Sequence, residues 1–341
     1  MSRKSKRNRK HSKKKRQKKT ELKKIGVVSD LHGNISAARN FAKYFLKHPV
    51  DAVVLNGDLS EIGEEDSVKD IVLCFKKLKC PVYVIPGSHE SWKQYRKLKR
   101  IKKNNIIDCF KMSNRKKKLD SYDLVFMPGS DFLSHNADFK MLSGRKELED
   151  AEYIYERYER RTLKFSFIED LFNLVKNPEK TIVVSHVPPL FRKGNAIYVA
   201  KFVKIPRKFK IKEKDLEKSD LILNMFLREG PVVEKSDQSL ITLDMAKELR
   251  KFKYPAKIYK ANRGNKNLAK AIKMLKVTKM ICGHFHESGS KGCDSDGKYV
   301  SPNKKVKSLF YNSGPGFEGL GGIYFIHDGK VSYRNIKVKW K

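Results

Sequence analysis

The hydrophobic residues of this chain fall into short runs that end abruptly in polar residues. Most of these runs are rich in residues that favour strands, and a stretch with the period of a helix usually follows. We expect strands at six runs: Ile25–Ser29, Ala52–Asn56, Val82–Pro86, Leu124–Met127, Thr181–Ser185 and Thr278–Cys282. Alternation of strands and helices predicts an α/β domain.

The helical segments lie between these runs. We expect helices at Ser36–Lys47, Ser67–Lys79, Ser91–Asn104, Lys146–Lys176 and Asn267–Leu275. Beyond Cys282 the pattern changes to a polar loop and then to short strands near Ser308–Asn312, Gly322–His327 and Val331–Val338. Asp328 and Gly329 are typical of a hairpin turn, so the last strands are expected to extend the sheet in antiparallel fashion.

Residues 191–258 have weaker periodicity, with helical runs near Leu216–Arg228 and Leu243–Lys251. We interpret this stretch as an insertion or cap within one domain that spans residues 25–341. Residues 1–24 differ from the rest, because they hold fourteen Lys and Arg with one acid, Glu21. Such a segment buries too little apolar surface to offset the entropy of ordering, which predicts a disordered basic tail.

Positive charge extends beyond the tail. The chain has 341 residues and a net charge of +38, of which residues 1–24 contribute +13 and the remainder still carries +25. Two segments are especially basic: Ser91–Lys118 has twelve basic residues and one acid, and Leu190–Lys212 has eight and none. A balance of this kind favours polyanionic partners such as nucleic acid or a phosphorylated small molecule.

The composition also limits where the protein acts. No stretch approaches the roughly 18 apolar residues of a membrane span, and no apolar signal segment opens the chain, so we expect neither a membrane nor a secreted protein. Five irregularly spaced cysteines do not suggest a disulfide framework. We therefore expect a cytoplasmic protein, or a nuclear one if the source has a nucleus. The sequence does not indicate an oligomeric state.

Chemically active side chains follow five of the six predicted strands. These clusters are Ser29 to Asn34, Asn56 to Asp58, Pro86 to Glu90, Ser185 to Pro189 and Cys282 to His286. Because ligands bind outside the carboxyl ends of strands in open α/β sheets, the clusters should converge on one site. Residues two apart in an extended segment point the same way, so Asp30 with His32, and His284 with His286, can each reach one ion.

A carboxylate combined with several imidazoles suits manganese, iron, zinc or nickel better than calcium. Two such ions about 3.5–4 Å apart can clamp a phosphoryl group for in-line attack. Cys282, His284, His286 and Cys293 could instead form a local zinc site. That alternative leaves the clusters around Asp30, Asp58 and His89 unexplained.

Five blocks in this order resemble the calcineurin-like metallophosphoesterases. They are Asp30-Leu31-His32, Gly57-Asp58, Gly87-Ser88-His89-Glu90, His186 and Gly283-His284-Phe285-His286. The segment from Asn262 to Leu268 and the turn Asn312-Ser313-Gly314 are also similar to the family. The resemblance runs from Ile25 to about Ile326 and is interrupted by the long insertion.

The resemblance implies a four-layer αββα sandwich with two mixed β-sheets and a site for two divalent metal ions. Asp30, His32, Asp58 and His286 would bind one metal, and Asp58, Ser88, His186 and His284 the other. His89 would be the catalytic histidine that is not a ligand, with Glu90 as its supporting partner and Asn34 as a further residue behind the ligands. We further expect Arg192 and Lys193, in the basic segment after His186, to contact the substrate.

Position 88 departs from the family pattern. The third block is normally Gly-Asn-His, whereas this chain has Ser88, whose hydroxyl is a shorter and weaker ligand than an amide oxygen. We therefore expect the second metal to be held loosely.

The sequence predicts a metal-dependent phosphoesterase in which a metal-bound hydroxide attacks phosphorus, with phosphodiesters slightly preferred over monoesters because of the charge. One alternative is a catalytically weakened scaffold of the same fold that binds RNA or a protein partner. Another is a nucleic-acid-binding protein in which the tail, through contact with RNA or a ribonucleoprotein, dominates the function.

Overall fold

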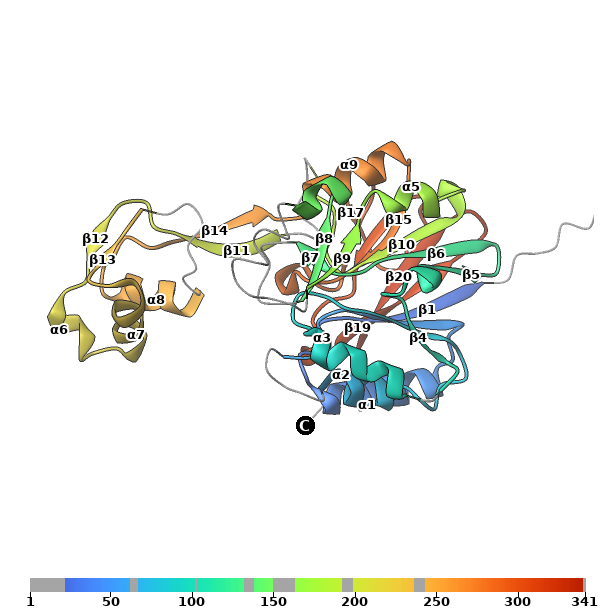
Figure 1. Cartoon of the computed structure of the whole chain (residues 1–341), viewed down its shortest axis with the longest axis horizontal. Coiled ribbons are helices and arrows are strands. Elements are labelled where there is room, and N and C mark those ends of the chain that lie inside the picture. The colour runs from blue at the N-terminus through green and yellow to red at the C-terminus, as the bar shows by residue number, and fades with distance from the viewer. Residues whose placement is uncertain are drawn as a thin grey trace, which may run out of the picture.

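Two mixed β-sheets lie face to face at the centre of the molecule, in a computed structural model of the chain (Figure 1). The structure describes residues 22–61, 67–101, 103–131, 138–149, 163–191, 199–235 and 243–339. Within these ranges helices cover the outer face of each sheet, which gives the predicted four-layer αββα sandwich. Of the predicted disordered tail, residues 1–21 lie outside the described residues. Its last two residues, Lys23 and Lys24, belong to strand β1, which begins at Lys23.

In the described part of the chain, six strands form the first sheet, in the order β20-β19-β1-β2-β3-β4. Strands β1 to β4 are parallel to one another, whereas β19 and β20 form an antiparallel hairpin next to β1. The bounds are Lys23–Val28 (β1), Ala52–Asn56 (β2), Val82–Ile85 (β3), Ile106–Asp108 (β4), Leu320–Ile326 (β19) and Val331–Lys337 (β20). The predicted antiparallel end of the chain is thus confirmed for β19 and β20.

The second sheet has the order β17-β16-β18-β15-β10-β6-β5 over the residues described. Its inner strands β6, β10, β15 and β18 are parallel, and antiparallel strands close both edges. The bounds are Lys116–Leu119 (β5), Tyr122–Met127 (β6), Thr181–Ser185 (β10), Lys279–Cys282 (β15), Lys291–Cys293 (β16), Tyr299–Val300 (β17) and Leu309–Asn312 (β18). Strand β18 was expected to be antiparallel, and for its pairing with β15 that prediction is wrong: the connection through β16 and β17 returns the chain to run parallel to β15. Strand β18 is antiparallel to β16.

Helices α1 (Ile35–Lys47), α2 (Ser67–Cys74) and α3 (Trp92–Tyr95) cover the first sheet, and α5 (Asp170–Leu174) and α9 (Lys266–Met274) cover the second (Figure 1). Short 3-10 turns occur at Arg96–Arg100, Met112–Asn114, Arg145–Glu147, Pro178–Lys180, His286–Ser288 and Gly316–Glu318. All the described helices are too short or too polar to cross a lipid bilayer. All five cysteines are free.

The alternation of side chains along each strand fills two different core layers. In β2, Ala52 and Val54 pack between the sheets, whereas Val53 and Leu55 pack against the helices. A third cluster lies between the second sheet and its helices α5 and α9. Each fully buried Val, Leu, Ile or Phe contributes about 1.5–3 kcal/mol, so these layers hold the strand ends in fixed positions.

Four predicted helices differ from the structure, three in the sandwich and one in the arm. Lys146–Lys176 is not one helix: it contains strand β9 (Lys164–Phe167) and the short α5, while residues 150–162 lie outside the described residues. Strand β9 pairs with β8 (Phe139–Leu142), itself beside β7 (Ser130–Asp131), and this pairing overrides the helical period.

The predicted helix Ser91–Asn104 is shorter than expected. Ser91 caps α3 as the sequence suggests, but the helix tightens into a 3-10 turn at Arg96. Arg96, Lys97, Lys99 and Arg100 place like charges one turn apart, which disfavours a long helix. Helix α2 likewise ends at Cys74, before the lysines that follow.

An arm projects from the sandwich at the left of Figure 1. Strands β11 (Val199–Lys204) and β14 (Lys257–Asn262) pair along their whole length and carry a small module at their far end. The module contains β12 (Phe209–Lys210), β13 (Val232–Val233), α6 (Glu213–Leu216), α7 (Asp220–Glu229) and α8 (Leu243–Lys251), which pack around a hydrophobic cluster of their own. The expected helix Leu216–Arg228 is divided in two, because Ser219 caps a new helix at Asp220.

Candidate metal centre

The carboxyl ends of five strands from the two sheets meet at one edge of the sandwich. Asp30 follows β1, Asp58 follows β2, Ser88 follows β3, His186 follows β10 and His284 follows β15. A cavity of about 560 Å³ opens there, lined by His32, Asn34, Asp58, Glu61, Ser88, His89, His284, His286 and Phe317. The structure therefore brings together every predicted ligand and the predicted catalytic histidine.

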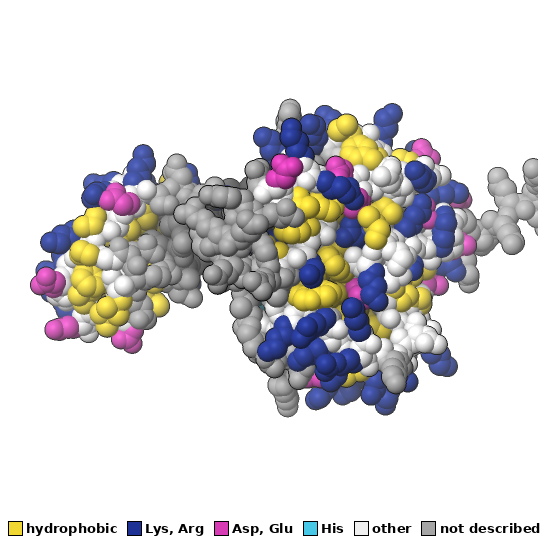
Figure 2. Space-filling view, viewed as in Figure 1, with side chains coloured by type: hydrophobic (Ala, Val, Ile, Leu, Met, Phe, Trp, Pro, Cys, Tyr) yellow, Lys and Arg dark blue, Asp and Glu magenta, His cyan; other side chains and the backbone are white. Residues whose placement is uncertain are grey.

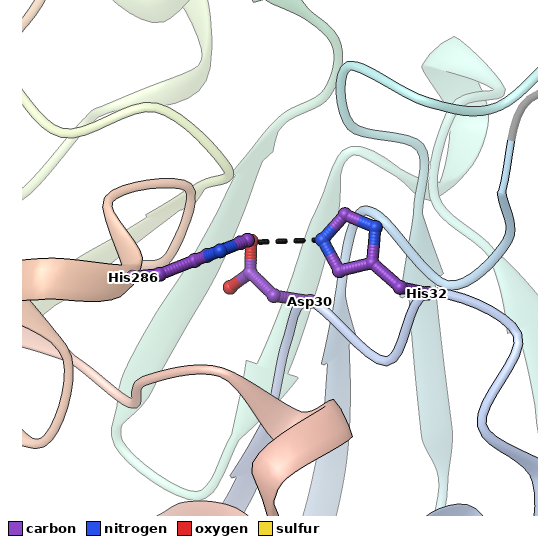
Figure 3. Close-up of side chains that lie close together, drawn as sticks. All are labelled: Asp30, His32 and His286. Atoms are coloured by element: carbon purple, nitrogen blue, oxygen red, sulfur yellow. Dashed lines mark hydrogen bonds and ion pairs between the residues drawn. The ribbon is translucent and has the colours of Figure 1, made fainter. Parts of the chain in front are cut away.

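The first group of donor atoms comprises Asp30, His32 and His286 (Figure 3). Oδ1 of Asp30 lies 3.3 Å from Nε2 of His286, and Nε2 of His286 lies 3.2 Å from Nε2 of His32. Asp30 also accepts the backbone N–H of His284 at 3.1 Å, which ties the β1 loop to the β15 loop. Two imidazole nitrogens and a carboxylate oxygen thus face a common point.

The second group comprises Asp58, His186 and His284. Nδ1 of His186 donates to the backbone carbonyl of Asn56 at 2.8 Å, so Nε2 is the ring atom that faces the cluster, 3.1 Å from Oδ2 of Asp58. Asp58 also belongs to a cluster with His32 and His89, in which the ligand atoms lie within 4.8 Å of one another. Asp58 therefore lies between the two groups.

Ser88 is fully buried beside Asp58. Its hydroxyl lies 2.8 Å from Oδ2 and 3.1 Å from Oδ1 of Asp58, and 3.5 Å from Nδ1 of His284. The side chain thus occupies the place predicted for a ligand, and in this arrangement it donates a hydrogen bond to the carboxylate.

Glu61 is a residue of the site that the sequence analysis missed. Its carboxylate lies 2.7 Å from Nδ1 of His32 and 3.3 Å from Nδ1 of His89. One acid therefore orients two imidazoles, so that Nε2 of each ring is available to the cavity. The signal in the sequence was an acid three residues after Asp58, on the same loop.

Glu90 has a different place from the one expected. Its buried carboxylate accepts backbone N–H groups of Gly87, Asp58, Leu59 and Ser60, with distances of 2.6 Å to Gly87 and 3.3 Å to Asp58 and Ser60. Glu90 thus joins the loops after β2 and β3 and fixes the backbone around Asp58. It is Glu61 that orients His89.

Asn34 supports the site from behind, as predicted. Its side chain caps α1 by accepting the Ala37 N–H at 2.9 Å, and it donates to the carbonyl of Phe317 at 3.0 Å. The Phe317 ring packs edge-on against His32 and His286. Phe317 is a second residue that the sequence analysis missed: it lies three residues after the turn Asn312-Ser313-Gly314 but belongs to none of the five blocks.

The backbone is strained at several of these positions. Asp30, His32, Asp58 and His284 all have positive φ values, of 55°, 44°, 51° and 70°. Such values are rare for residues other than glycine and cluster at functional sites. The strain is maintained by the loop contacts of Glu90 and Asp30.

The charges of the site are strongly coupled. Burial alone would raise the pKa of Asp58, but His186 outweighs it and holds that pKa well below its usual range. Burial disfavours a charged His186, yet the carboxylate of Asp58 raises its pKa to about 10. The same balance between burial and His286 lowers the pKa of Asp30.

The donor atoms fit divalent metal ions. Nε2 of His186 is buried without a hydrogen-bond partner of suitable geometry, although a carboxylate oxygen lies 3.1 Å away. Nitrogen and oxygen atoms that converge in this way are typical of manganese, iron or zinc sites. Among the described residues, the clusters that could hold a metal contain no cysteine, and Cys282 and Cys293 are packed in the hydrophobic layer instead. The alternative of a local zinc site is therefore not supported.

The two residues predicted to contact substrate, Arg192 and Lys193, lie outside the described residues.

Known proteins are similar to this chain either in sequence, over part of its length, or in the path of the backbone. Over 78 residues the chain is 38% identical to a probable cyclic nucleotide phosphodiesterase of Coxiella burnetii, covering 20% of this chain and about a third (32%) of that relative. Solved structures with a similar backbone path include the protein TT1561 of Thermus thermophilus. It has 12% identity and a TM-score of 0.48, and the match covers 92% of this chain and 99% of that one. A dimetal phosphatase from Danio rerio has 10% identity over 93% of this chain and 99% of its own, with a TM-score of 0.45.

The sequence model of one family matches residues 23–223, which include the first four of the five blocks and more than half of the chain. The chain belongs to the calcineurin-like phosphoesterases.

Proposed function

We propose that this phosphoesterase is a dinuclear, metal-dependent phosphodiesterase. The observation that carries the proposal is that Asp58 belongs to one cluster of donor atoms with His186 and His284 and to another with His32 and His89, at one cavity. A phosphoryl group in this cavity would meet both groups and His89 together.

The proposed ligand sets take the two groups and assign Asp58 to both, because Asp58 also lies in a cluster with His32 of the first group. Asp30, His32, Asp58 and His286 would hold one ion, and Asp58, His186 and His284 the other, with Ser88 beside them. When bound, the two ions would supply Lewis-acid polarisation of the phosphoryl oxygens and activation of a water molecule.

His89 is the residue placed for proton transfer. Its Nε2 lies 4.0 Å from Oδ2 of Asp58 on the wall of the cavity, while Glu61 contacts Nδ1 on the other side of the ring. When the bond from phosphorus to the leaving oxygen breaks, that oxygen can take a proton from Nε2 of His89. Such a proton transfer is worth about 10²–10⁴ in rate.

The preference for a diester rests on the surroundings of the cavity. Trp92, three residues after His89, lines a groove of about 360 Å³. Aromatic rings and basic side chains make up most of the lining, together with two acids, Asp108 and Asp170. Nζ of Lys164 lies 4.9 Å and Nζ of Lys99 lies 5.6 Å from the centre of the Trp92 ring. Lys and Arg side chains are also spread over this face of the sandwich (Figure 2). A nucleotide or nucleic-acid diester matches stacking rings and positive charge, and the Coxiella burnetii relative is named as a probable cyclic nucleotide phosphodiesterase.

We place this activity in the cytoplasm, or in the nucleus of a eukaryotic source, because all five cysteines are free thiols. We also propose that residues 191–258 are an insertion in the family domain, since the arm they form has a hydrophobic cluster separate from the sandwich.

The alternative function is a weakened scaffold that keeps the fold and has lost turnover. The hydrogen bond from Ser88 to Asp58 favours it, since the hydroxyl is directed to the carboxylate. The proton-transfer geometry of His89 and Glu61 favours the enzyme, because a scaffold needs neither.

Hydrolysis assays distinguish the two. The purified chain would be tested with manganese, nickel or zinc on bis-p-nitrophenyl phosphate, p-nitrophenyl phosphate, a cyclic nucleotide and single- and double-stranded nucleic acids. We expect diester hydrolysis that chelation abolishes and that His89→Asn lowers by about 10²–10⁴ at near-parental metal content. His48→Asn, at the end of α1, is the matched control. Inactivity of the parent with every metal would favour the scaffold.

A further inference from the structure

A second cavity lies at the opposite end of the strands from the metal centre. It has a volume of about 900 Å³ and is lined by the beginnings of β1, β6 and β15, by the turn before β10, and by the β19–β20 hairpin turn. Lys279 begins β15, and His284 follows the other end of that strand. At about 3.3 Å per residue the two sites are on the order of 15 Å apart.

Lysines dominate the lining of this cavity. Six of them face it, namely Lys23, Lys176, Lys180, Lys276, Lys279 and Lys307, against three acids, Asp120, Glu179 and Asp328. No carboxylate of a described residue makes an ion pair with Lys176, Lys180, Lys276 or Lys307, all of which are exposed. Four exposed cations on one rim are therefore available to an anionic ligand.

Lys279 adds a cation at the base of the cavity. Its side chain is 3% exposed, and Nζ donates to the backbone carbonyl of Glu179 at 2.8 Å and to the Thr278 hydroxyl at 3.3 Å. Burial lowers the pKa of this ammonium. Because the hydrogen-bond acceptors are neutral oxygens, they stabilise the charge without cancelling it.

The basic N-terminal segment joins the fold at the same cavity. Lys23, where β1 begins, belongs to the lining, and residues 1–21 directly precede it with twelve Lys and Arg and one acid. Lys23 therefore links the lysines of the cavity to a segment that is strongly basic in sequence. Positive charge on both sides of Lys23 favours an extended polyanion over a compact anion.

We propose that this surface, the basic cavity, docks a nucleic-acid strand through its phosphates, at a site separate from the metal centre. A strand supplies regularly spaced phosphates that match the six lysines in the lining of the cavity. The lining offers few aromatic faces for stacking, since Tyr122 is buried. Recognition should therefore be independent of base sequence. This inference does not depend on the catalytic function proposed above.

The test compares two variants of the full chain with equal loss of charge. In the cavity variant Lys176, Lys180, Lys276 and Lys307 are replaced by Gln. In the control variant Gln replaces Lys43, Lys47, Lys214 and Lys218, which are exposed on α1 and near α6. Binding of a fluorescent single-stranded RNA, and of a DNA of the same sequence, is measured with chelator present between about 50 and 200 mM salt.

We expect the affinity of the cavity variant for RNA to fall about tenfold or more. The slope of log affinity against log salt concentration should become less steep by about 3, because about four phosphate contacts are lost. The control variant should change affinity by about twofold or less. Equal losses in both variants would overturn the proposal, because they would show a response to net charge alone. Loss of binding to phosphatidylserine vesicles with unchanged RNA binding would assign the surface to a membrane and also overturn it.

A footprint of the parent protein gives an independent measurement that needs no variant. Amine-reactive labelling followed by mass spectrometry should show Lys276 and Lys307 protected by the RNA, with Lys43 and Lys47 labelled as before. Unprotected cavity lysines at saturating RNA would contradict the proposal, whatever the variants show. Replacement of the four cavity lysines by Arg should retain binding, since Arg keeps the charge.

Discussion

The hydroxyl of Ser88 donates a hydrogen bond to Oδ2 of Asp58 at 2.8 Å, at the position where the family pattern has an asparagine. The hydroxyl competes with a metal for the lone pairs of the residue shared by both donor groups. An asparagine amide at this position would add an oxygen ligand.

Ser88→Asn is therefore expected to tighten the weaker metal site. The manganese concentration for half-maximal diester hydrolysis should fall, and calorimetry should show a second binding event at lower metal concentration, because one more oxygen ligand is present. Ser88→Ala is the control, since it removes the hydrogen bond without adding a ligand. Identical titration curves for Ser88→Asn and the parent would show that position 88 does not contact metal.

Asp58→Asn should remove more metal than any other single change to a ligand. Asp58 lies between both donor groups, whereas Asp30 belongs to only one of them. Bound metal measured by mass spectrometry should fall for both ions in Asp58→Asn and mainly for one ion in Asp30→Asn. Equal losses in the two variants would argue against a bridging role.

The sequence allowed the convergence of these side chains on one site to be predicted, because strand period and strand topology act together. Asp30, Asp58 and His186 each follow a buried strand, and parallel strands place their carboxyl ends at one edge whatever the loops do. The same argument gives the layers of the sandwich, since side chains alternate between two cores along strands such as β2.

The residues that were missed depend on loop conformation. Glu61 reaches His32 and His89 only because the β2 loop turns back at Asp58, which has a φ of 51°. Phe317 is brought to His32 by a loop near the end of the chain. Strand β9 was missed for a related reason. Its partner β8 ends at Leu142, far before β9 begins at Lys164, so no local sequence pattern reveals the pairing.

Glu61→Gln should lower turnover by about 10–100-fold, the usual effect of removing a group that orients an imidazole. The carboxylate contacts ring nitrogens of both His32 and His89, so an amide would leave the orientation of both rings less fixed. We expect kcat to fall more than KM changes, with partial recovery in Glu61→Asp. Glu318→Gln, an exposed change on the 3-10 turn beside Phe317, should have no such effect. Turnover of Glu61→Gln equal to that of the parent would remove Glu61 from the mechanism.

Metal binding should release protons. In the absence of metal the carboxylate of Asp58 raises the pKa of His186 to about 10, so His186 carries a proton at neutral pH that a metal must displace. The affinity for metal should consequently rise with pH at pH values below 10, by about tenfold per pH unit for each proton that binding releases. Calorimetry in buffers of different ionisation enthalpy counts these protons. An affinity that is constant between neutral and mildly alkaline pH would contradict the expected protonation of His186.

Gly87→Ala tests whether close backbone packing holds the shared carboxylate in place. A Cβ at Gly87 would lie 2.7 Å from the backbone N of Asp58 and 2.8 Å from Cδ2 of His186, and it would also meet Oδ1 of Asp58. These distances are shorter than real Cβ contacts, so either the loop or the two ligands must move. Overpacking of this kind costs about 1–3 kcal/mol in the free energy of unfolding.

The informative readout for Gly87→Ala is metal content, because many substitutions lower stability. Gly230→Ala in the arm is the matched control: its φ of 82° makes alanine unfavourable there, yet nothing lies within 4 Å of the added Cβ. It should lose about 1–3 kcal/mol of stability from backbone strain alone, because a φ of 82° with a ψ of −175° is adopted almost only by glycine. We expect thermal unfolding to register both variants, whereas only Gly87→Ala should lose bound metal and diester hydrolysis. Full metal content in Gly87→Ala would mean that the loop after β3 adapts, and that Glu90 alone is sufficient to position Asp58.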